Sequence, residues 1–178
     1  MARAKETSDR IMQTFTVTHV ERDQVAATYP LVREIMPDMA RTDWLRFARR
    51  ATAPSITRSS GIMIARDEGQ PFPSGLFCYH TILDPKYRTV LCADHFIALH
   101  VLDPAPVVDA LIAELDRLAE RLDCAAIRSL VHAGGSELAK RLIRTGHVVE
   151  GAQFCKVLRG GGAEAKPSPF PFIVPNVL

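Results

Sequence analysis

The chain has 178 residues, the length expected of one domain with a short extension or tail. Its composition, with 47% hydrophobic and 24% charged residues, is typical of a folded globular protein. It excludes an intrinsically disordered chain, which would have fewer apolar residues and a large excess of one charge sign. A formal net charge of +2 excludes a histone-like polycation, and we expect no nucleic-acid partner.

The cysteines and the hydropathy pattern narrow the class further. Cys78, Cys92, Cys124 and Cys155 are scattered and form no C-x-x-C pair, which argues against a disulfide framework and a zinc finger, and we expect no bound metal. Residues 1–10 are charged, so no secretory signal is predicted. No uncharged run approaches the ~20 residues of a membrane helix. We therefore predict a cytoplasmic protein without a membrane partner.

The first half of the chain predicts a strand, two helices and an antiparallel meander. β-Branched residues alternate in the first strand, and apolar residues at helical spacing follow it. Thr42 is a candidate N-cap for the second helix. Three apolar runs joined by short polar turns then predict the meander. The predicted elements are a strand over residues 14–19, helices over 25–36 and 42–51, and strands over 61–65, 76–83 and 89–102.

The second half predicts helices alternating with strands. A stripe of apolar residues from Val107 to Leu122 predicts the longest helix. A strand over 126–131, a helix over 136–144 that Gly146 ends, and a strand over 153–158 follow it. Such units imply parallel pairing after the antiparallel meander. We expect an α/β protein with a central mixed sheet and helices on both faces.

The ends of the chain differ from the middle. We predict an N-terminal extension over 1–13, one domain over 14–158, and a glycine hinge with a proline-rich arm over 159–178. Phe170 and Phe172 would dock the arm on its own domain or across a homodimer, or the arm is a loose tail.

This order of elements, together with the segment SELAKRLIRTGHVVE over 136–150, resembles the GNAT superfamily of N-acetyltransferases. The resemblance covers about residues 14–158. Gly146-His147 stands where the family has glycine followed by an aromatic residue, and the strand over 89–102 with the helix after it resembles the family's central cofactor-binding strand and helix. It implies a GNAT-like acyl-CoA N-acyltransferase fold.

The resemblance also implies a reaction. An acetyl group would move directly from acetyl-CoA, as co-substrate, to an amine of a small molecule or a protein. The pantetheine arm would lie along the central strand like an added strand. Ser136 is either a cofactor contact or simply a helix cap. The cofactor-binding residues that this implies are Leu99, His100, Val101, Leu102, Val107, Val108, His132 and Ser136.

The expected pyrophosphate-binding loop is degenerate. Asp103 replaces the family's Gln or Arg, and Pro104, Pro106 and Val108 stand at glycine-type positions. Proline donates no N–H, and the carboxylate is negative where a phosphate would lie. Alternatively, Asp103 caps the helix and Pro104 is its first residue. Leu142 also stands where the family often has a tyrosine that acts as the general acid and protonates the thiolate. The chain is therefore either an acetyltransferase with an atypical loop or a catalytically inactive GNAT-fold binding or regulatory protein.

The catalytic candidates lie on the long strand. His100 near its end is a suitable base for an amine, or else a hydrogen-bonded histidine inside the sheet. Asp94 is an alternative base, or a partner for His80 on the neighbouring strand. If the alternation of side chains is unbroken, one face of this strand carries Cys92, Asp94, Phe96, Ala98 and His100.

A basic stretch precedes the meander. It would bind an acidic acceptor or a phosphate near the acceptor site, or form a solvated face. Its members are Arg41, Arg46, Arg49, Arg50 and Arg58.

Overall fold

The computed structural model describes residues 14–53, 59–67, 70–99, 103–131 and 136–151. They fall into two compact units, residues 1–130 and residues 131–178, and each is described by itself. The strands are β1 (Phe15–His19), β2 (Ser60–Asp67), β3 (Gly75–Asp84), β4 (Arg88–Ala98) and β5 (Ala126–Ser129). The helices are η1 (Val25–Thr28), α1 (Tyr29–Ile35), α2 (Arg41–Ala51), α3 (Ala105–Arg121) and, in the second unit, α4 (Ser136–Arg144).

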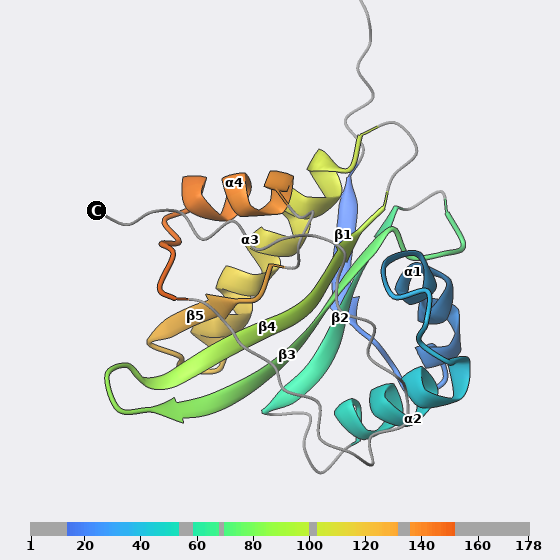
Figure 1. Ribbon diagram of the computed structural model, residues 1–178, viewed down its shortest axis with the longest axis horizontal. Coiled ribbons are helices and arrows are strands. Elements are labelled where there is room, and N and C mark those ends of the chain that lie inside the picture. Colours follow the sequence, from blue (N-terminus) through green and yellow to red (C-terminus); the bar gives the residue numbers. More distant parts are fainter. Residues whose placement is uncertain (1–13, 54–58, 68–69, 100–102, 132–135, 152–178) are drawn as a thin grey trace, which may run out of the picture. The chain divides into compact units, whose positions relative to one another are not determined.

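The first unit is a mixed five-stranded sheet in the order β1-β2-β3-β4-β5 (Figure 1). The first four strands pair antiparallel, and β5 pairs parallel to β4. α1 and α2 cover one face of this sheet and α3 covers the other (Figure 1). The predicted mixed sheet with helices on both faces is therefore confirmed.

The core under α1 and α2 is built around Trp44, which is 1% exposed. Its Nε1–H donates to the Thr28 hydroxyl oxygen at 2.9 Å, and that hydroxyl donates to the Val25 carbonyl at 2.7 Å. Ile62 and Ile64 of β2 complete this packing from the sheet. The hydrogen bonds fix α2 against η1, because a buried indole N–H without an acceptor would be costly.

The core on the opposite face is built on the apolar stripe of α3. Val107, Leu111 and Leu115 are fully buried against the sheet, as the sequence pattern predicts. Gly75 of β3 permits this close approach, since a Cβ there would lie 2.7 Å from Val107 Cγ1 and 2.9 Å from the Ile97 carbonyl oxygen. α3 therefore lies directly on the sheet at the ends of β3 and β4.

A β-bulge interrupts β4. Leu76 pairs with Ile97 but Cys78 pairs with Asp94, so three steps along β4 match two along β3. His95 is the extra residue of the bulge, and its backbone is in the left-handed conformation, with φ 50°. The predicted unbroken alternation is therefore wrong. Cys92 and Asp94 lie on the α2 side, with His80 and Cys78 opposite them, whereas Phe96 and Ala98 pack on the α3 side.

Two predicted helix ends have different outcomes. Thr42 does not cap α2, which begins at Arg41 with Ala40 as N-cap and no side-chain hydrogen bond there. Gly146 does end α4: its φ of 96° favours glycine, and the His147 N–H behind it donates to the Leu142 carbonyl at 3.0 Å.

Candidate functional site

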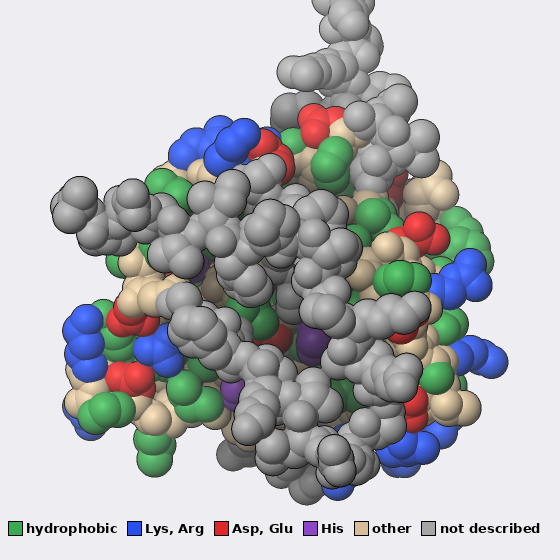
Figure 2. Space-filling view, viewed as in Figure 1, with side chains coloured by type: hydrophobic (Ala, Val, Ile, Leu, Met, Phe, Trp, Pro, Cys, Tyr) green, Lys and Arg blue, Asp and Glu red, His purple; other side chains and the backbone are tan. Residues whose placement is uncertain are grey.

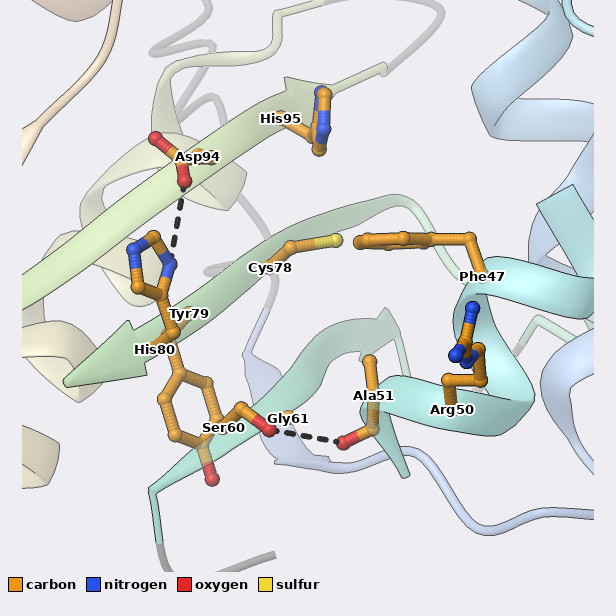
Figure 3. A pocket seen from close by; sticks show the side chains of 10 residues that line it. All are labelled: Phe47, Arg50, Ala51, Ser60, Gly61, Cys78, Tyr79, His80, Asp94 and His95. Carbon is orange, nitrogen blue, oxygen red and sulfur yellow. Dashed lines mark hydrogen bonds and ion pairs between the residues drawn. The ribbon is translucent and has the colours of Figure 1, made fainter. Parts of the chain in front are cut away.

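A cavity of about 330 Å³ lies on the α2 side of the sheet (Figure 3). α2 contributes Phe47 and Arg50 to its lining, and three strands form its base. The polar and reactive groups from the sheet are Cys78, His80, Asp94 and His95. The cavity therefore combines charged, imidazole and aromatic groups in a small volume.

Asp94 and His80 face one another across β3 and β4 (Figure 3). Asp94 Oδ2 lies 3.4 Å from His80 Nδ1, which confirms the predicted partnership of these two residues. Their side chains are 32% and 48% exposed, so both can meet a ligand. The carboxylate favours the imidazole tautomer with its proton on Nδ1, which leaves Nε2 as a proton acceptor.

The bulge brings a second histidine to the same cavity. Asp94 and His95 are consecutive residues of β4 that both line it, at the point where the bulge shifts the register against β3. The His95 ring lies 5.9 Å from the Phe47 ring at 85°, an edge-to-face contact between β4 and α2. His95 is therefore held by α2 as well as by its own strand.

Cys78 lies at the base of the cavity, with its Sγ directed toward Phe47 (Figure 3). Burial raises the pKa of the thiol well above its usual range, and the nearby Asp94 carboxylate adds to this. The thiol is protonated near neutral pH and supplies no nucleophile. Among the described residues, no three His, Cys, Asp or Glu side chains come together as metal ligands. None of the described helices is long and apolar enough to cross a bilayer.

Of the predicted basic stretch, only Arg50 lines the cavity among the described residues. Arg46 pairs with Asp43 at 2.9 Å, away from the cavity, and Arg58 lies outside the described residues. On the face that Figure 2 shows, Lys and Arg side chains form separate groups with acidic side chains among them. The described arginines therefore differ in position, and among them Arg50 is the one placed to touch a ligand in this cavity.

β4 and β5 separate beside Asp94. Within the described residues, β5 pairs with β4 only over residues 90–93, and the last contact is the Leu130 N–H to the Ala93 carbonyl at 2.9 Å. Beyond this point the Leu99 N–H donates toward β3, to the Ser74 carbonyl at 2.8 Å. Because backbone N–H and C=O groups alternate between the two sides of a strand, those of Ala98 and Phe96 point away from β3, to the edge where β5 no longer pairs.

The first turn of α3 offers few donors to an anion. The Asp103 carboxylate accepts the Ala105 N–H at 2.9 Å, but α3 begins at Ala105 with Pro104 as its N-cap, one residue later than the predicted cap at Asp103. Pro104 and Pro106 have no N–H, and the Val108 N–H donates to the Pro104 carbonyl at 3.0 Å. Among the described residues 103–108, few backbone N–H groups are therefore left to bind an anion at this helix N-terminus.

Only some of the other predicted cofactor contacts lie within the described part of the chain. The side chains of Val107 and Val108 are buried, so only the Val107 N–H remains as a donor in this turn. Ser136 begins α4, and its side chain lies outside the described part of the chain. The same is true of the predicted strand over 153–158 and the arm over 159–178. Also outside are His100, the predicted base, and Val101, Leu102 and His132.

Sequence reasoning missed two features of this site. Phe47, on the helix predicted over 42–51, was not among the predicted site residues, but it is 43% exposed and lines the cavity. His95 was expected on the opposite face from Asp94. Its position depends on the bulge, and no glycine or proline marks that position in the sequence.

No protein-family model matches the chain, and no curated protein is similar to it in sequence. Several solved structures are similar in fold. An aminoglycoside N-acetyltransferase in complex with CoA has a TM-score of 0.69 at 13% identity, over 83% of this chain and 96% of that one. A ribosomal-protein-alanine N-acetyltransferase from Brucella melitensis has a TM-score of 0.63 at 14% identity, over 82% of this chain and 100% of that one.

A transcriptional regulator from Bacillus halodurans C-125 has a TM-score of 0.69 at 6% identity, over 82% of this chain and 100% of that one. Matches at such identities show the fold. The chain has a GNAT-like fold, as the sequence predicts.

Proposed function

We propose that the chain is an acyl-CoA-dependent N-acetyltransferase that transfers an acetyl group directly from acetyl-CoA to an amine in the α2-side cavity. The observation that supports this most is the Asp94–His80 pair, which lines that cavity where β4 and β5 separate. A thioester at the opening would meet an amine in the cavity without a covalent enzyme intermediate. The acceptor is a small-molecule amine or an amine of a protein.

The proton of the amine is the main chemical obstacle. An alkyl amine is largely protonated near neutral pH and must lose a proton before its lone pair can attack a carbonyl carbon. Asp94 attracts the ammonium group, and His80 Nε2 accepts the proton. The new C–N bond forms as the C–S bond breaks, the thiolate of CoA leaves, and the second proton that the nitrogen loses passes to this thiolate to give the free thiol. A thiolate departs readily, so Leu142 need not be replaced by an acid.

The open edge of β4 is the proposed binding surface for the donor. The backbone groups of Phe96 and Ala98 would pair with the amides of the pantetheine arm, as a sheet edge pairs with an added strand. The donor-poor first turn of α3 would add little affinity for the phosphates. Donor binding therefore depends mainly on the strand edge.

A catalytically inactive GNAT-fold binding or regulatory protein is the second candidate. Two observations favour it: the first turn of α3 holds a carboxylate and two prolines where phosphates would need donors, and Leu142 supplies no acid. One structure of similar fold is titled a transcriptional regulator. The two candidates differ in whether acetyl-CoA binds and reacts.

The test combines calorimetry with acetyl-CoA and a thiol-release assay over a panel of amines. We expect the His80→Gln variant to lose about 100-fold or more in kcat, the usual contribution of a general base, with acetyl-CoA affinity within twofold of wild type. Asp94→Asn should also lose kcat, because it removes the charge that attracts the ammonium group and orients His80. Asp116→Asn, an exposed change on α3, is the control. Unchanged kcat in His80→Gln would refute the assigned base, and folded protein that binds no acetyl-CoA would favour the inactive protein.

A further inference from the structure

We propose that the acceptor is an amino carboxylate with an apolar or aromatic body, held between Arg50 and the Asp94–His80 pair. This inference rests on the proposed function for its catalytic consequence, but its binding step is independent of it. Arg50 and Asp94 come from α2 and β4 and line the same cavity, with Phe47 and Cys78 between them (Figure 3).

Arg50 is the anion-binding end of the site. No carboxylate of the described residues lies within ion-pair distance of it, whereas Arg46, one turn earlier, pairs with Asp43. A guanidinium presents its N–H groups in a planar fork that matches a carboxylate in two parallel hydrogen bonds. The last turn of α2 also favours a cation at this position. Arg50 is therefore available to a carboxylate of a ligand.

Asp94 is the cation-binding end. It is the one carboxylate in the described lining of the cavity, as Arg50 is the one guanidinium. An amine that carries a carboxylate is thus attracted at both ends. A ligand with only one of these groups leaves one charged side chain without its counterpart.

The space between the two ends sets the size and the apolar character of the ligand. The exposed Phe47 ring lies 5.5 Å from the Trp44 ring beneath it, so it presents a supported aromatic surface. Cys78 and Ala51 add apolar lining. A cavity of about 330 Å³ is at the small end of ligand sites and has room for about ten water molecules at ~30 Å³ each. This matches an amino acid whose amine and carboxylate lie at opposite ends of an aromatic body, such as 4-(aminomethyl)benzoate.

The test measures binding by calorimetry without an acyl donor, using 4-(aminomethyl)benzoate, 4-methylbenzylamine and 4-methylbenzoate. 4-Methylbenzylamine lacks the carboxylate, and 4-methylbenzoate lacks the amine. We expect wild type to bind 4-(aminomethyl)benzoate about tenfold or more tightly than either analogue. Arg50→Gln should lose this advantage, while its affinity for 4-methylbenzylamine stays within twofold of wild type.

Arg49→Gln is the matched control, because Arg49 is exposed in the same helical turn but does not line the cavity. Equal binding of 4-(aminomethyl)benzoate and 4-methylbenzylamine, an unchanged preference in Arg50→Gln, or no binding of the three probes at millimolar concentration would overturn the inference. Transfer to 4-(aminomethyl)benzoate with no dependence on Arg50 would overturn the inference and leave the proposed function intact. Arg50-dependent binding of 4-(aminomethyl)benzoate without acetyl transfer would contradict the proposed function and leave the inference intact.

Discussion

The Thr28 hydroxyl is the best place to test how η1 and α2 are held together. It accepts from Trp44 Nε1 at 2.9 Å and donates to the Val25 carbonyl at 2.7 Å, and both Thr28 and Trp44 are 1% exposed. Thr28→Val keeps the volume but removes both bonds. An orphaned buried N–H costs about 1–3 kcal/mol, and the lost bond to Val25 about 1 kcal/mol more. We expect the free energy of unfolding to fall by about 2–4 kcal/mol.

Trp44 is the single tryptophan of the chain, so its fluorescence reports on this contact directly. Urea unfolding followed by fluorescence and by far-ultraviolet circular dichroism should show a lower midpoint for Thr28→Val. Thr28→Ser keeps the hydroxyl and should lose only about 1 kcal/mol. In a Trp44→Phe background, Thr28→Val should cost at least about 1 kcal/mol less. A Thr28→Val variant within about 0.5 kcal/mol of wild type, with unchanged emission, would refute the reasoning.

Gly75→Ala places a Cβ 2.7 Å from Val107 Cγ1 and 2.9 Å from the Ile97 carbonyl oxygen. Because a strand carbonyl cannot move aside, we expect a loss of about 1–3 kcal/mol, or about 2–10 °C in Tm by calorimetry, partly recovered by adding Val107→Ala. An unchanged Tm would contradict this. Burial raises the pKa of Tyr79 to about 12. The unfolded chain loses this proton first, so the free energy of unfolding should fall from about pH 10 to 12, and less steeply in Tyr79→Phe. Equal slopes in urea unfolding would contradict it.

Regular patterns made most of the fold predictable. The stripe from Val107 to Leu122 predicted α3, and alternation predicted the strands of the meander, because burial on one face repeats with the period of the element. Gly146 predicted the end of α4 because few other residues adopt its φ. Thr42 failed as a cap because α2 begins at Arg41, one residue before it.

The site was less predictable because it depends on register between strands. Asp94 and His80 could be matched as neighbours from the meander, and the structure places them 3.4 Å apart. The faces of β4 beyond Asp94 could not be assigned, since a bulge shifts every later side chain and leaves no composition signal. Which of the described arginines lines the cavity depends on how α2 lies on the sheet, and the number of charges in the sequence does not reveal that it is Arg50.

The extra residue at His95 also determines which sequence changes the strand tolerates. Deleting it would return β4 to a regular pleat, because Phe96 would then follow Asp94 on the opposite face and Ile97 would still pair with Leu76. Ile97 would stay in the layer that contains Trp44, and Phe96 would keep its stacked contact with Phe77, whose ring centroid lies 5.4 Å away. A single-codon deletion here would therefore remove a side chain from the cavity and spare both hydrophobic layers.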